Sequence, residues 1–131
     1  MRSLTRTYPC RLDELSACRV DVETWLLEND ADEETREAVV LAAHELVADA
    51  VTAEGCVGVH VTGGFLDSEI WLEVRAEGAW EPPAPSYDED GFGIELVNRL
   101  MDQVKVVAGE GRASTRVLAR RTCGPKIDAD V

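Results

Sequence analysis

The sequence predicts an α/β fold, a two-layer sandwich in which a mixed, mostly antiparallel sheet carries its helices on one face. Two observations lead to this fold class. Segments with alternating apolar residues come in adjacent pairs, as in β-hairpins, and segments with apolar residues three and four apart stand between them. The length of 131 residues suits one compact domain. We expect that domain over residues 1–123, followed by a flexible tail over 124–131.

The first part of the chain predicts one short strand and two helices. "SLTRTY", residues 3–8, alternates as a strand does, and Pro9 ends it. Apolar residues over 12–28 fall three and four apart, which is typical of an amphipathic helix. The acidic "ENDADEE" then supplies a cap and first-turn carboxylates for a second helix over 33–53. Because this helix is apolar almost all round, we expect it in the centre of the domain.

The middle of the chain predicts a β-hairpin. Residues 56–62 and 69–75 form its strands, and "GGFLDS" over 63–68 is the expected loop. Alternate residues of each strand should point into the core: Val57, Val59 and Val61 in the first, Ile70, Leu72 and Val74 in the second.

The last part predicts a loop, a third helix and a second pair of strands. "AWEPPAPSYDED", residues 79–90, holds three prolines and is expected to be a loop. The third helix begins near Gly91. Two strands follow, near 104–107 and 114–121, and "AGEGR" joins them. The expected order is therefore strand, two helices, two strands, helix, two strands.

The net charge limits the possible partners. Lys and Arg number 13 and Asp and Glu 26, which gives a formal charge of −13. Such a chain is not expected to bind nucleic acid or an anionic membrane directly, and it suits basic protein surfaces. No apolar run approaches the roughly 20 residues of a membrane span. The opening "MRSLTRTYPC" lacks the apolar core of a signal peptide.

The cysteines show no recognisable spacing. Cys10, Cys18, Cys56 and Cys123 are scattered and form no C-x-x-C pair. We expect reduced thiols in a cytoplasmic protein. The two histidines have no ligand spacing with these cysteines, so no metal site of His and Cys is predicted.

Three features of the chain could carry chemistry, and the first is an acidic pair on the second helix. Glu45, Asp49 and Thr52 stand at positions i, i+4 and i+7, a single polar stripe on an otherwise apolar helix. Like charges four apart destabilise a helix by roughly 0.2–0.5 kcal/mol. The stripe is either the solvated edge of a buried helix or a general base with a ligand for a metal ion.

The other two features are glycines beside predicted elements. In "VRAEGAW" a strand runs into Gly78, which suits a turn or a close approach of the backbone to a ligand. In "DGFGIELV" Gly91 and Gly93 stand immediately before a helix, where free backbone N–H groups can hold phosphate. Each feature alone is weak evidence for a site.

The order and spacing of the three features together resemble the ATPase fold of the GHKL superfamily, and most closely its small bacterial anti-sigma factor serine kinases. The resemblance runs from about Tyr8 to Arg121 and includes the ending "GIELVNRLMDQVKVVAGEGRASTRVLARR". It implies ATP and Mg²⁺ as cofactors, and a sandwich of the GHKL, or Bergerat, type.

The first motif of that family is E-L-V-x-N-A, in which the Glu is the general base and the Asn holds magnesium. "ELVADA" matches it with Glu45 as the base and Asp49 at the position of the Asn. Hard cations prefer carboxylates, so Asp49 could still hold Mg²⁺. Without the metal ion, its charge would repel phosphate.

The second motif is D-x-G, in which the Asp accepts a hydrogen bond from the adenine amino group. Here "AEG" puts Ala76 at that position and keeps Gly78. Ala76 has no acceptor, and Glu77 would point the other way along a strand. The contact that selects adenine is therefore lost.

The third motif is a glycine box over the phosphates, which Gly91 and Gly93 retain in outline. Phe92 stands where the family often has a basic residue, and residues 79–90 contain no Lys or Arg. A polyphosphate would therefore meet a negative pocket without a basic clamp in these motifs.

The resemblance implies a regulator that binds a sigma factor or an anti-anti-sigma protein in a partner-switching circuit. The departures from the motifs indicate that ATP binding is weakened or lost. An active ATP-dependent serine kinase is the alternative, with Glu45 as base and Mg²⁺ on Asp49. A third possibility is a structural module that forms homodimers. The first helix is a candidate docking element, in which Trp25 either contacts the partner or belongs to the core.

Overall fold

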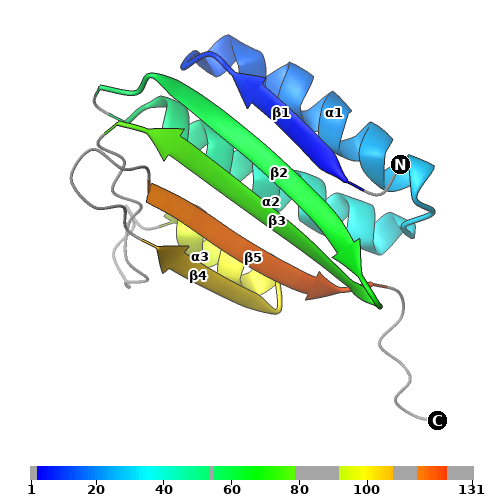
Figure 1. Cartoon of the computed structure of the whole chain (residues 1–131). Helices are drawn as coiled ribbons and strands as arrows, with labels where there is room; N and C mark the ends of the chain where they lie inside the picture. The colour runs from blue at the N-terminus through cyan, green and yellow to red at the C-terminus, as the bar shows by residue number, and fades with distance from the viewer. Residues whose placement is uncertain (1–2, 54, 79–91, 108–114, 124–131) are drawn as a thin grey trace, which may run out of the picture.

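The computed structural model of the chain describes residues 3–53, 55–78, 92–107 and 115–123 (Figure 1). In chain order its elements are β1 (Leu4–Tyr8), a 3-10 turn (Leu12–Glu14), α1 (Leu15–Glu28), α2 (Glu33–Val51), β2 (Gly58–Leu66), β3 (Glu69–Glu77), α3 (Phe92–Leu100), β4 (Gln103–Val107) and β5 (Thr115–Thr122). The order of strands and helices is the one that the sequence predicts.

In the described part of the chain, five strands form one sheet in the spatial order β1-β2-β3-β5-β4. Each pair of neighbouring strands is antiparallel. Figure 1 shows α1, α2 and α3 together on one face of this sheet. The predicted two-layer sandwich with helices on one face is therefore confirmed.

Helix α2 lies at the centre of the helical layer, between α1 and α3. Its buried residues recur three and four positions apart, which gives a continuous buried stripe that is apolar except for its first member, Thr35. The stripe consists of Thr35, Ala38, Val39, Ala42, Ala43, Leu46, Val47, Ala50 and Val51. Alternate residues of the strands form the core side of the sheet beneath the helices. They are Val59, Val61, Ile70, Leu72, Val74, Ala76, Val117 and Ala119. The central position expected for the second helix is confirmed.

The N-terminus of α2 is built as the sequence predicts. Asp32 stands at the N-cap, and Glu33 and Glu34 occupy the first turn, where carboxylates interact favourably with the helix dipole. The buried hydroxyl of Thr35 donates a hydrogen bond to Asp32 and lowers the pKa of that carboxyl. This contact fixes the point at which the chain enters the central helix.

The hairpin loop is shorter than the sequence predicts. β2 continues to Leu66, so the expectation of a loop over 63–68 is wrong for most of that range. A Cβ on Gly63 would lie 2.7 Å from the ring of Trp25, and a Cβ on Gly64 would lie 2.7 Å from the ring of Trp71. The two glycines thus lie within the strand, and glycine is needed there because indole rings occupy the space that a side chain would fill.

One side chain differs from expectation, and a second decides between two alternatives that the sequence left open. Val57, predicted to point into the core, is 73% exposed, because it precedes the first residue of β2 and lies outside the pleat. Trp25 is 3% exposed, with its ring centroid 5.1 Å from that of Phe65. It therefore belongs to the core, and the alternative in which Trp25 contacts a partner is wrong.

The prediction that all four cysteines are reduced is also wrong. Cys10 and Cys56 form a disulfide with a Cα–Cα distance of 6.0 Å, while Cys18 and Cys123 are free thiols. The cause is the register of β1 and β2, in which Tyr8 pairs with Val59. The two cysteines lie just beyond this pair, Cys10 after the end of β1 and Cys56 before the start of β2, a proximity that sequence spacing does not reveal.

Several sequence predictions lie outside the described residues. These are the Pro-rich loop over 79–90, Gly91, the connection over 108–112 and the flexible tail over 124–131. Among the described helices, none has both the length and the apolar character needed to cross a membrane.

Candidate functional site

The segments that carry the three candidate features meet at one end of the molecule. Figure 1 shows the end of α2, the end of β3 and the start of α3 at the same side of the sandwich. Helices α2 and α3 also pack against each other. The fold therefore brings together elements that are distant in the sequence, as a common site requires.

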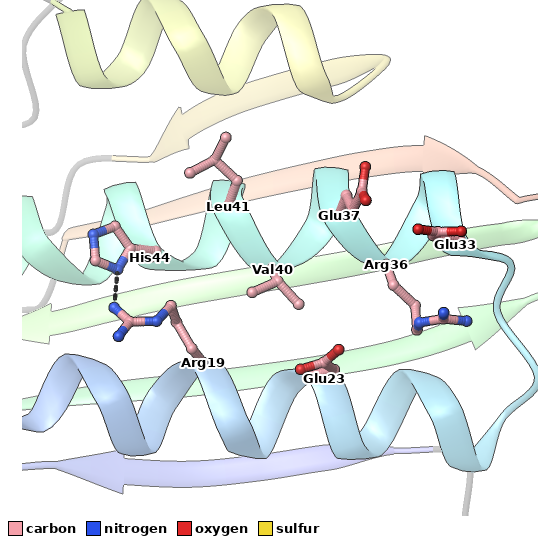
Figure 2. A pocket seen from close by; sticks show the side chains of 8 residues that line it. All are labelled: Arg19, Glu23, Glu33, Arg36, Glu37, Val40, Leu41 and His44. Carbon is pink, nitrogen blue, oxygen red and sulfur yellow. Dashed lines mark hydrogen bonds between the residues drawn. The ribbon is translucent and has the colours of Figure 1, made fainter.

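Glu45 and Asp49 lie on the flank of α2 that is nearer to α3. Residues four apart on a helix stand one above the other, and Figure 2 shows Leu41, one turn before Glu45, directed toward α3. Both carboxylate residues are half-buried. The hydroxyl of Thr52, the third member of the stripe, donates to the backbone oxygen of Asp49 at 2.9 Å. Thr52 thus provides a hydrogen-bond partner for a backbone oxygen in the last turn of α2.

Ala76 is fully buried on the side of β3 that faces the helices. It pairs with Val59 of β2 on one side and with Thr115 of β5 on the other. Glu77 lies on the opposite face of the sheet, where its carboxylate is 3.5 Å from Nε2 of His60. The alternation of the strand therefore directs Glu77 away from the position of Ala76, as predicted.

Gly78 has a structural reason to be glycine. Its φ is +121°, a conformation that side chains rarely adopt, and a Cβ there would lie 2.4 Å from the backbone oxygen of Gly55. The N–H of Val57 donates to the backbone oxygen of Glu77 at 3.0 Å. The end of β3 is thus held against the segment that follows α2. Gly78 serves this close approach of two backbones whether or not a ligand binds.

The glycine box is described only in part. Gly93 lies in the first turn of α3, which begins at Phe92, and Gly91 precedes the described residues. The backbone N–H groups of a first turn lack partners within the helix, which is why a helix start can hold an anion. The phosphate-binding role of Gly91 and Gly93 stays a prediction.

The segments that supply the three motifs contain very little positive charge. From Glu37 to Asn98 the only Lys or Arg is Arg75, which faces away from the helices on β3. The same stretch contains 13 Asp and Glu residues. Polyphosphate carries several negative charges, so these segments oppose its binding unless cations compensate.

A magnesium ion would depend on few protein ligands. No group of three or more His, Cys, Asp or Glu side chains suited to a metal ion occurs within the described residues. Mg²⁺ is usually held by one or two carboxylates together with phosphate oxygens and water. The carboxylate of Asp49 matches the protein's share of such a set, provided that a nucleotide brings the rest.

The flank of α2 toward α1, where no functional residue was predicted, lines a groove with α1. The groove has a volume of about 450 Å³, and Val40 and His44 contribute to it from α2 (Figure 2). Arg36, Val40 and His44 are four residues apart, and this spacing was the sequence signal that they share one flank of α2. Periodicity alone does not reveal which neighbour such a stripe faces.

Comparisons with known proteins agree with the arrangement of these elements. Residues 8–120 match the family described as the histidine kinase-like ATPase domain. Among solved structures, the crystal structure of the RsbU and RsbW domains of Rv1364c from Mycobacterium tuberculosis is similar, with a TM-score of 0.76 and 19% sequence identity. The match covers 95% of this chain and 34% of that chain, so this chain spans about a third of that protein's length. No curated protein matches the sequence.

Proposed function

Since this chain belongs to the histidine kinase-like ATPase domain family, we propose that it is an anti-sigma-type regulator in which ATP binding is weakened or lost. Its partner is a sigma factor or an anti-anti-sigma protein in a partner-switching circuit. The motif resemblance from Tyr8 to Arg121 and the fold shared with a structure that contains an RsbW domain support this proposal.

The observation that carries the loss of ATP binding is the burial of Ala76. The position expected to accept a hydrogen bond from the adenine amino group is a methyl group with 0% exposure. Leaving a buried amino group without an acceptor costs about 1–3 kcal/mol. This corresponds to a loss of roughly one to two powers of ten in affinity. Glu77 offers no substitute, because it lies on the other face of the sheet.

The negative charge of the surrounding segments also weakens ATP binding. Asp49 replaces a neutral Asn, and Arg75, the one cation between Glu37 and Asn98, faces away from the site. Each additional negative charge near the phosphates raises the electrostatic cost of binding. Asp49 contributes favourably only if Mg²⁺ enters with the nucleotide.

An active serine kinase is the alternative, and the retention of Glu45 favours it. In that case Glu45 removes the proton from the hydroxyl of the substrate protein, and Asp49 holds the magnesium ion that bridges the phosphates. Glu45 is half-buried on the flank of α2 near α3, which is compatible with such a role. A purely structural dimerisation module, the third possibility, would need neither nucleotide nor partner.

A double variant separates these proposals. Ala76→Asp with Asp49→Asn recreates the family's residues at both positions, and we expect calorimetry with ATP and Mg²⁺ to show binding that the native protein lacks. Glu77→Asp with Asp49→Asn is the matched control, because its carboxylate remains on the opposite face. Equal binding by the native protein and the double variant would contradict the role given to Ala76. A structural module would bind neither ATP nor a partner protein.

A further inference from the structure

The groove between α1 and α2 has an apolar floor that is open to solvent. Figure 2 shows Val40 between the two helices, with Leu41 beside it on α2. Leu41 is 39% exposed. On α1, Val20 and Leu27 are 62% and 51% exposed and stand three and four residues from Glu23, which lines the groove. Apolar side chains therefore lie along the floor and one border of the groove.

The carboxylates of the groove have no partner within the described residues. Glu23, Glu33 and Glu37 line it, and among the described residues none of their carboxylates forms an ion pair or a side-chain hydrogen bond. Such carboxylates remain available to cations from outside the chain.

The two arginines of the groove are already engaged by the protein. Arg19 places Nη1 3.0 Å from Nδ1 of His44, the contact marked in Figure 2. Nη1 of Arg36 donates to the backbone oxygen of Ala31 at 2.6 Å. Their hydrogen bonds hold α1 against α2 and the connection between them. The groove therefore has cations that are committed to the fold and carboxylates that are not.

The charge of the segment that contains α1 and α2 strengthens this contrast. Residues 11–51 contain 12 Asp and Glu and 3 Arg, a difference of −9 out of the chain's −13. The open face of the sheet is more balanced, because Glu69 pairs with Arg120 and Glu73 pairs with Arg116. The negative field of the protein is thus concentrated over the groove side of the molecule.

From these observations we propose that the groove between α1 and α2 docks a basic amphipathic helix of a partner protein. The apolar side of that helix contacts Val40, Leu41, Val20 and Leu27, while its Lys and Arg side chains reach Glu23, Glu33 and Glu37. A helix that lies in a groove is a common mode of peptide recognition. The proposal rests on the proposed function as a protein-binding regulator and names the surface that this regulator uses.

The groove and the nucleotide motifs share the helix α2 but not the same residues. The α2 lining of the groove ends at Leu41 and His44, and neither Glu45 nor Asp49 belongs to it, although Glu45 lies one turn after Leu41. A partner can therefore dock in the groove without contacting the residues of the nucleotide motifs.

A labelled peptide tests the proposal. The probe is a fluorescent Leu/Lys peptide of about 18 residues, patterned as an amphipathic helix and long enough to form one. A peptide of the same composition in scrambled order keeps the charge and loses the apolar face. We expect fluorescence anisotropy to show that the patterned peptide binds at least about tenfold more tightly, since burial of one or two leucines corresponds to that factor. Its association rate should fall as salt is added.

Surface variants locate the binding. Leu41→Asn and the double variant Glu33→Gln with Glu37→Gln should each weaken binding about tenfold or more. Leu66→Asn and Asp67→Asn, at the exposed β2–β3 turn, are the matched controls and should bind as the native protein does. No binding of the patterned peptide, equal binding of both peptides, or groove variants that bind like the controls would overturn the proposal. Because the experiment contains no nucleotide, such a failure would leave the account of the ATP pocket untouched.

Discussion

The Cys10–Cys56 disulfide joins the end of β1 to the segment that precedes β2, so removing it should lower the stability of the fold. The two cysteines are 46 residues apart. In the chain-entropy treatment, a crosslink that closes a loop of this length disfavours the unfolded chain by about 4 kcal/mol at 25 °C. Measured values are often smaller, and we expect Cys10→Ser to lower the free energy of unfolding by about 2–4 kcal/mol.

The assay is urea unfolding followed by tryptophan fluorescence, because Trp25 is buried in the core and reports its loss. Adding a reductant should lower the free energy of unfolding of the native protein by the same amount. The free energy of unfolding of Cys10→Ser should not change when the reductant is added. Cys123→Ser is the control, since this thiol is free and half-buried. In unreduced, unfolded protein the structure predicts 2 free thiols. Four free thiols, or equal stability with and without reductant, would refute the reasoning.

Three further predictions test local features of the fold. Gly78→Ala should lower the free energy of unfolding by about 1–3 kcal/mol in urea titrations, whereas Gly58→Ala, where an added Cβ meets open space, should not. Burial and a hydrogen bond to a carboxylate raise the pKa of Tyr8, so its contribution to stability is full below about pH 10 and is lost as the pH rises further. Tyr8→Phe should therefore remove this alkaline loss from unfolding curves. Burial raises the pKa of Cys18 to about 11, and mass spectrometry should find iodoacetamide on the half-buried Cys123 well before Cys18 at pH 8.

The elements of the fold were predictable where periodicity reports burial. The stripe of apolar residues on α2 and the alternation of Ile70, Leu72 and Val74 both follow from which face packs into the core. The order of the strands and helices then predicted the two-layer sandwich. Adjacent strand pairs form antiparallel hairpins, and the helices must cover the apolar face of the sheet.

The errors arose where a residue's role depends on a distant neighbour. Gly63 and Gly64 have the composition of a turn, yet indole rings occupy the space that their side chains would fill. Cys10 and Cys56 meet only through the register of β1 and β2. Val57 continues the alternation of its strand but lies outside the ladder. None of these relations can be read from local sequence.

For the candidate site, the sequence predicted the elements that carry the residues, and the roles of those residues stay predictions. The family motifs located Glu45 and Ala76 on elements that do meet at one end of the fold. The direction of Glu77 followed from strand alternation, and the 3.5 Å distance between its carboxylate and Nε2 of His60 on the open face of the sheet agrees with it. The groove between α1 and α2 was not predicted, because its lining residues come from two helices whose contact is a tertiary property.

Isothermal titration of the native protein with ATP and Mg²⁺ tests the central claim most directly. The claim is that Ala76 and the acidic surroundings have removed the family's nucleotide affinity while the fold persists. We predict no heat of binding at micromolar ATP and no phosphate transfer to a candidate partner. A dissociation constant in the micromolar range would contradict the claim and favour the serine kinase that uses Glu45 as its base.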